Sequence, residues 1–140
     1  GSFIYAMRTH EERRDISIIR SDKLLLRIAV RRSLGVEQKL MSEDEIQSML
    51  NGLGVQYIAA QPDFWTDLEA MKRFENVLHS SHFQKLRTFT MPANYPAQEK
   101  EIVVYKNLDP VSDKPRQLNI ELPMIGKTVS GTVGQDGAAK

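Results

Sequence analysis

The sequence predicts an α/β fold, a three-layer Rossmann-like sandwich whose mainly parallel sheet carries an antiparallel hairpin at one edge. A capped helix leads directly into the segment Val55–Ala60, which is apolar on both faces apart from Gln56. This pattern is typical of a strand covered on both sides by helices. A second helix follows, as in crossover units. Two later strands have no helix between them, which indicates antiparallel neighbours.

Length and composition indicate one globular domain. A chain of 140 residues with 41% hydrophobic and 26% charged residues can bury a core. We expect a single α/β domain over residues 1–130 and a disordered tail over residues 131–140, whose only large apolar residue is Val133. The chain begins with Gly1-Ser2 instead of Met, so we expect it to be part of a longer protein. No apolar run reaches the roughly 18 residues of a spanning helix, and no signal peptide is visible.

Composition also excludes several functions. The chain has no cysteine, which rules out disulfides, zinc-thiolate sites and thiol catalysis. The net charge is +1, but residues 1–40 carry +4, residues 41–81 carry −5 and the remainder carries +2. Locally paired surface charge explains this pattern, and a basic N-terminal face that meets an anionic partner is the alternative. The arginines belong to no nucleic-acid-binding motif, so no nucleic acid partner is predicted.

The first forty residues contain two predicted helices and one strand. Phe3, Ile4 and Met7 suit one face of a short helix, and the β-branched alternation of Asp15–Arg20 predicts a strand. Ser21-Asp22 then caps a helix over Lys23–Ser33, with Gly35 as the residue that ends it. A strand over Leu24–Val30 competes with this helix, because periodicity does not separate the two.

The middle of the chain has the clearest signals. Ser42 and Glu45 form a capping box, followed by an apolar stripe on one helix face at Ile46, Met49, Leu50 and Leu53. Gly52 or Gly54 ends that helix. After Val55–Ala60, Thr66 and Glu69 form a second capping box. The next helix has its predicted buried face at Leu68, Met71, Phe74, Val77 and Leu78.

The last part of the chain is richer in strands. Phe83–Met91 and Glu101–Lys106 have strand composition, with a loop between them. Gln117–Pro123 alternates apolar and polar residues, which predicts a short edge strand or an arm.

Two segments are candidate ligand sites. The turn Gln61–Trp65 follows the predicted central strand, and ligands of open α/β sheets bind beyond the carboxyl ends of the strands. There Asp63 suits a sugar hydroxyl or a metal, and Trp65 suits stacking on a sugar. The alternative is that this turn caps the next helix and staples it to the sheet. Asp22 and Lys23 also follow a strand, but a lone Asp-Lys pair is a weak signal, and a helix cap beside a surface lysine explains it adequately.

No catalytic residue, metal or cofactor is predicted. His79 and His82 could join His10 around a metal, but positions near a helix C-terminus favour histidine without one. The sequence has no glycine-rich phosphate loop and no nucleophile elbow. A small enzyme with a crevice around Asp22, Lys23 and Asp63 is the catalytic alternative.

Four segments together resemble a known family. They are Phe3–Arg8, Ile19–Leu26, Leu53–Ile58 and Glu101–Leu108. The series resembles the soluble C-terminal region of bacterial membrane glycosyltransferases of the mannosyltransferase-like type. Such enzymes move a sugar from a polyprenyl-phosphate donor to an acceptor.

This resemblance implies a non-catalytic accessory domain on the extracytoplasmic (periplasmic) side of the inner membrane. Its partner would be the transmembrane part of the same polypeptide, and a glycan or lipid-linked sugar is a further candidate ligand. In that family the catalytic carboxylate lies between transmembrane helices, so no catalytic residue transfers to this chain. The alternative, from a different class, is a free-standing cytoplasmic protein-interaction or regulatory module.

Overall fold

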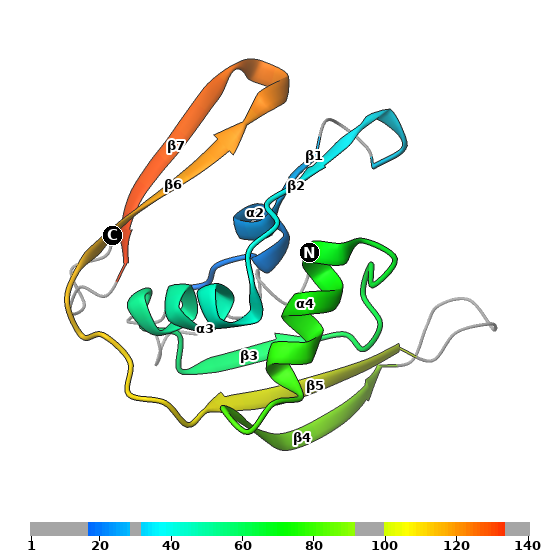
Figure 1. The fold of residues 1–140 in the computed structure, drawn as a ribbon, viewed down its shortest axis with the longest axis vertical. Coiled ribbons are helices and arrows are strands. Elements are labelled where there is room, and N and C mark those ends of the chain that lie inside the picture. The colour runs from blue at the N-terminus through cyan, green and yellow to red at the C-terminus, as the bar shows by residue number, and fades with distance from the viewer. Residues whose placement is uncertain (1–16, 29–31, 92–99, 134–140) are drawn as a thin grey trace.

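The computed structural model describes residues 17–28, 32–91 and 100–133 (Figure 1). Its helices are α2 (Ser21–Leu25), α3 (Glu43–Gly52) and α4 (Glu69–Leu78), with short 3₁₀ helices η2 (Arg32–Leu34) and η3 (Pro123–Ile125). Its strands are β1 (Leu26–Ile28), β2 (Val36–Gln38), β3 (Tyr57–Ala60), β4 (Phe83–Met91), β5 (Lys100–Asn107), β6 (Arg116–Leu122) and β7 (Lys127–Val133).

The sheets correct the predicted fold class. All strand pairs among the described residues are antiparallel, in two hairpins, β1–β2 and β6–β7, and a three-stranded sheet of order β3-β5-β4. The α4 helix does connect two strands of the same direction, β3 and β4, but β5 runs between them and pairs with both. The parallel Rossmann-like sandwich is therefore wrong, because a returning strand occupies the position beside β3.

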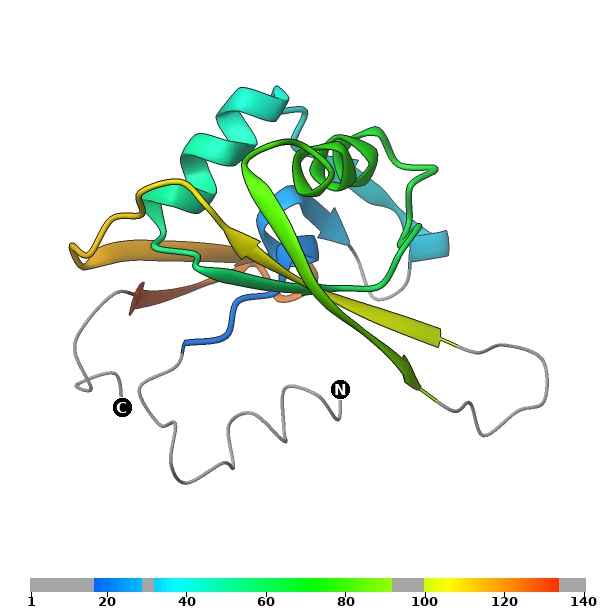
Figure 2. The same ribbon diagram turned by 90° about the horizontal axis from the view of Figure 1, so that it is seen from below.

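Helices cover one face of this sheet. The α3 and α4 helices lie on the same side of it (Figure 2). Tyr57 is 58% exposed and Ala59 is exposed on the other side. The prediction that this strand is covered on both faces is thus wrong within the described residues. A strand of four apolar residues shows the same sequence pattern even when only one of its faces is buried.

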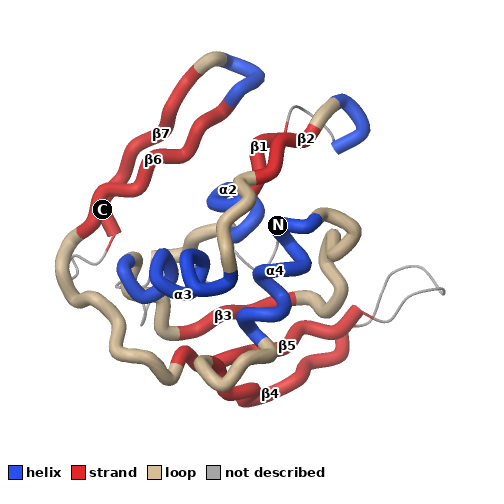
Figure 3. The backbone as a smooth tube through the Cα atoms, in the orientation of Figure 1, coloured by secondary structure: helices blue, strands red, loops and turns tan. Residues whose placement is uncertain are grey.

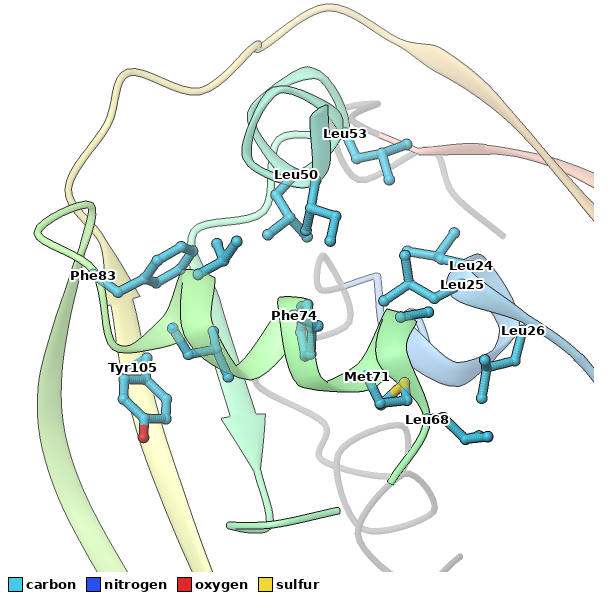
Figure 4. Packing of buried hydrophobic residues seen from close by; sticks show 14 of the residues in the cluster. Leu24, Leu25, Leu26, Leu50, Leu53, Leu68, Met71, Phe74, Phe83 and Tyr105 are labelled. Carbon is cyan, nitrogen blue, oxygen red and sulfur yellow. The ribbon is translucent and has the colours of Figure 1, made fainter. Parts of the chain in front are cut away.

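The core lies between the sheet and the helices (Figure 4). Leu25 of α2 and Ile46 of α3 are fully buried, each at 0% exposure. The other buried side chains from the three helices include Leu24, Leu50, Ala70, Met71, Phe74, Val77 and Leu78. Phe83, Val103 and Tyr105 close the core from the strands. Burial of these side chains is the main force that holds the short elements together.

The predicted boundaries of α3 are confirmed. The Glu45 N–H donates to Ser42 Oγ at 3.1 Å, and the Ser42 N–H donates back to Glu45 Oε2 at 2.7 Å. At the other end Gly54 has a φ of +74° and donates to the Asn51 carbonyl. Val55 donates to the Leu50 carbonyl at 3.0 Å. These two bonds form a Schellman motif, which requires a left-handed residue that glycine adopts without strain.

The second predicted capping box is wrong. The α4 helix begins at Glu69, and no side chain of its N-cap residue, Leu68, caps it. Gln38 of β2 does so instead, because its Oε1 accepts from the Ala70 N–H at 2.9 Å. The cap thus comes from a residue distant in sequence, which a local pattern cannot reveal.

The N-terminal predictions are mostly outside the described residues or wrong. The helix at Phe3–Met7 lies outside them. Ser17–Arg20, the described part of the predicted strand, has no regular structure. The helix predicted over Lys23–Ser33 ends at Leu25, and the chain continues as β1, so the competing strand is correct for Leu26–Ile28.

The later strands agree better with the sequence. The predicted strands 83–91 and 101–106 are present as β4 and β5, and they pair antiparallel, although β5 is central in its sheet. The predicted arm is β6, whose hairpin with β7 extends away from the body (Figure 3). The β7 strand runs to Val133, beyond the predicted domain boundary, and residues 134–140 lie outside the described part.

We predict that Leu25→Ala lowers the free energy of unfolding by about 2–5 kcal/mol, because it leaves a cavity at a fully buried position. Leu34→Ala is the matched control, since Leu34 is 66% exposed. Its change should stay within about 0.5 kcal/mol. Urea denaturation followed by circular dichroism measures both. Similar losses for the two variants would show that Leu25 does not lie in the core.

Candidate functional site

A buried polar cluster joins α3 to the end of β5. It contains Gln47 and Asn51 of α3, Asn107 of β5 and Asp109, which follows the strand. Gln47 and Asn107 are each only 6% exposed. Gln47 and Asn51 are four residues apart, so they share one face of the helix.

Hydrogen bonds connect all four members. Gln47 Nε2 lies 3.0 Å from Asp109 Oδ2 and 3.3 Å from Asn107 Oδ1, and Asn51 Nδ2 donates to Asp109 Oδ2 at 3.0 Å. Asn107 Nδ2 donates to Asn51 Oδ1 at 2.8 Å and to the Val55 carbonyl at 3.0 Å. Such hydrogen-bond networks fix the positions of their side chains more precisely than apolar contacts do.

His82 completes the cluster at its exposed side. Its Nδ1 lies 2.9 Å from Asp109 Oδ1, and its side chain is 47% exposed, against 24% for Asp109. The backbone also joins the two segments, since Leu108 N–H donates to the His82 carbonyl at 2.8 Å. The hydrogen bond from His82, together with those from Asn51 and Gln47, holds the pKa of the Asp109 carboxyl below its ordinary value.

A histidine oriented by a carboxylate is the arrangement of a general base. Nucleophilic catalysis also needs a hydroxyl or thiol within reach of the histidine. Among the described residues, the His82 ring makes no hydrogen bond to a serine or threonine hydroxyl. The Ser80 hydroxyl accepts from the His82 backbone N–H at 3.3 Å and donates to the Val77 carbonyl. The amides of the cluster bond to one another and to Asp109, although Gln47 Oε1 is buried without a hydrogen-bond partner in the described part of the chain. The cluster therefore joins the helix to the sheet, and the described residues around it form no catalytic set.

The predicted turn at Gln61–Trp65 is held by contacts within the protein. Asp63 and Trp65 both have left-handed backbone, with φ of 56° and 54°. The Trp65 ring stacks on Phe64 at a centroid distance of 4.6 Å, and the Arg32 guanidinium lies 5.6 Å from the Trp65 ring centroid. Arg32 also pairs with Asp67. The turn is thus tied to η2, while the Asp63 side chain remains exposed.

The other predicted pair lies in α2. Asp22 is 6% exposed and accepts two bonds from Arg20, at 3.0 and 2.8 Å. Lys23 is partly exposed beside it. In the described part of the chain, no polar contact connects Asp22 or Lys23 with Asp63 or Trp65. The crevice that would unite them belongs to a parallel sheet, and the antiparallel topology does not create it.

One open groove of about 600 Å³ lies along the exposed sides of α3 and α4. Two polar contacts line it: Asn76 Nδ2 donates to Glu43 Oε1, and Arg73 pairs with Glu69. Surface pairs of this kind contribute little stability and indicate no ligand.

Sequence reasoning missed the polar cluster. Neither Asn107 nor Asp109 was predicted to be a site residue, and His82 was considered only as a metal candidate or a helix-end residue. The amides at Gln47 and Asn51 share a helix face, which is the one local signal for the cluster. Among the described residues, no group of three possible ligands gathers around a metal position.

Comparisons with known proteins identify no relative. No family model matches the chain, no curated protein matches it, and no solved structure matches it. In the part of the chain that the structure describes, no helix is both long and apolar enough to cross a membrane.

We predict that the Asp109 carboxylate stabilises the fold above about pH 4, the ordinary aspartate range. Its pKa is lowered on folding, so its contribution is lost as the pH falls through the lowered pKa. Asp109→Asn should reduce the Tm at pH 7. The Tm of this variant should also fall less than that of the unmodified protein when the pH is lowered.

Thermal unfolding across the acid range measures this effect, with Asp113→Asn as the control at a nearby exposed carboxylate. If the Tm of Asp109→Asn falls as much at acid pH as the Tm of the unmodified protein does, the assignment is contradicted.

Proposed function

We propose that the chain is a non-catalytic binding domain, and that the β6–β7 hairpin is its contact arm. The alternation of apolar and polar residues along the hairpin is the main support for this proposal. Leu118, Ile120, Leu122 and Val129 lie on one face, because paired residues of antiparallel strands share a face. The opposite face is polar and contains Gln117, Asn119, Glu121, Thr128, Ser130 and Thr132.

The apolar face begins in the core and continues into solvent. At the base of the hairpin, Val133 is 8% exposed and Leu118 packs against the core. Toward the tip, Val129 is 54% exposed and Ile125 is 60% exposed. An exposed apolar surface that continues from the core favours contact with another surface.

The arm contacts the rest of the domain near both of its ends. Arg27 Nη2 of β1 pairs with Glu121 Oε2 of β6 at 2.7 Å. The Arg116 guanidinium lies against Gly52 at the end of α3, where a larger side chain would clash. A two-stranded hairpin alone has marginal stability in water. The hairpin is thus held beside β1 and α3 while Val129 and Ile125 stay exposed, which suits an arm that a partner covers.

The resemblance of the four sequence segments supports one particular setting. In that setting the chain is the extracytoplasmic accessory domain of a membrane-bound glycosyltransferase, and the arm contacts the transmembrane part of the same polypeptide. The isolated chain would not transfer sugar, and a glycan or lipid-linked sugar would be a ligand of the assembled protein.

We predict that a photo-reactive amino acid at Val129 of the full-length protein, in membranes, crosslinks to its transmembrane part. Ser130 is the matched control, because it is the next residue, is also exposed and faces the opposite side of the hairpin. Mass spectrometry of the crosslinked peptides identifies the partner.

A soluble protein that crosslinks to Val129 but not to Ser130 would favour the free-standing interaction module and reject the membrane setting. Equal or absent crosslinking at the two positions would contradict a contact role for the arm.

A further inference from the structure

The face of the β3-β5-β4 sheet that turns away from α3 and α4 carries both aromatic and basic side chains. Val103 and Tyr105 of β5 are buried on the helix side, so the residues that alternate with them lie on the outward face, together with their strand partners. Among the described side chains, this outward face comprises Tyr57, Ala59, Gln84, Arg87, Phe89, Ile102, Val104 and Lys106. Its rings are 58% exposed at Tyr57 and 43% exposed at Phe89, and its two basic side chains are exposed as well.

The basic groups lie beside the apolar residues of this outward face. Arg87 pairs with Val104 across the sheet, and its guanidinium lies 4.8 Å from the centroid of the Phe89 ring. Lys106 pairs with Tyr57. A basic side chain can lay its methylene stem along apolar surface while its charged group reaches outward. The outward face is therefore mixed, with cations next to rings and aliphatic side chains.

The described side chains of the outward face include no acid. The three strands contain one acidic residue, Glu101, which pairs with Thr90 and so faces the other side of the sheet. In the part of the chain that the structure describes, no ion pair involves Arg87 or Lys106. The charge of this face thus complements a negatively charged surface.

We propose that the outward face of the sheet lies against the anionic headgroups of a membrane. Basic residues close to a bilayer are attracted to anionic lipids. Aromatic rings suit the headgroup region, where apolar and polar surroundings meet. The helices pack on the opposite side of the sheet, so they do not stand between this face and the lipid (Figure 2).

Single-stranded nucleic acid is also anionic, but it fits the outward face less well. It binds where successive bases can stack on neighbouring aromatic rings. Tyr57 and Phe89 belong to the two outer strands, with β5 between them, so about 10 Å separates their strands. Arg87 also occupies one side of the Phe89 ring. A lipid surface does not require adjacent rings, and the aliphatic residues between them suit it.

This inference rests on the proposed membrane setting in one respect. Two cations and two rings attract a bilayer only weakly. Such a contact suits a domain that its own polypeptide already holds at the membrane, because tethering raises the effective concentration of the lipid. The outward face would then orient the domain on the membrane, while the arm contacts the transmembrane part.

Co-sedimentation with vesicles tests the outward face without the transmembrane part. At millimolar lipid and low ionic strength, we expect this chain to bind phosphatidylglycerol vesicles and to bind phosphatidylcholine vesicles several-fold less. Arg87→Gln should weaken binding to phosphatidylglycerol by about fivefold, the loss expected for one basic residue at the surface. The control is Lys85→Gln, an exposed cation of the same strand that pairs with Tyr105 and so faces the helix side. It should leave binding nearly unchanged.

A pair of aromatic variants gives an independent result. Tyr57→Ala should weaken binding to phosphatidylglycerol vesicles, because it removes a ring from the outward face. Phe64→Ala should not, since this exposed ring lies in the turn before α4, outside the outward face. Circular dichroism checks that each variant is folded.

Equal binding to the two lipids, or no binding to phosphatidylglycerol, would overturn the proposal. Equal effects of Arg87→Gln and Lys85→Gln would also overturn it. Binding of a single-stranded oligonucleotide that Arg87→Gln weakens, with no binding to vesicles, would assign the face to nucleic acid instead. All these variants keep the β6–β7 arm, so a failed crosslink at Val129 beside intact vesicle binding would reject the arm and retain this face.

Discussion

The polar cluster of Gln47, Asn51, Asn107 and Asp109 determines how α3 meets the sheet. Apolar contacts are non-directional and tolerate small shifts, whereas buried amides and carboxylates must find specific partners. Residues about sixty positions apart satisfy one another only when α3 lies against the end of β5. The cluster therefore fixes α3 over one face of the sheet, and the core forms between α3, α4 and that face (Figure 4).

This one-sided arrangement leaves two surfaces with exposed apolar residues. The outer face of the sheet carries Tyr57 and Phe89, which are 58% and 43% exposed. The β6–β7 arm extends away from the body with Ile125 and Val129 exposed, and this favours a separate surface as its partner. The polar groups of the cluster join α3 to the end of β5.

Local signals predicted local structure well. The Ser42–Glu45 capping box, the strands 83–91 and 101–106, and the buried face of α4 could all be inferred from neighbouring residues. Strand order could not be inferred in this way, because an apolar run such as Tyr57–Ala60 does not reveal which strand pairs with it. The Gln38 cap of α4 and the polar cluster also join distant segments, so neither was visible in the sequence. Asp22 and Asp63 were plausible site residues only within a parallel sheet.

A double-mutant cycle between Asn51→Ala and Asp109→Ala tests most directly whether the cluster holds α3 to the sheet. The two side chains are in contact, with Asn51 Nδ2 3.0 Å from Asp109 Oδ2. Unfolding free energies of the two single variants and the double variant should reveal a coupling of about 0.5–3 kcal/mol. Effects that add to within about 0.3 kcal/mol would contradict the account, because independent sites behave in that way.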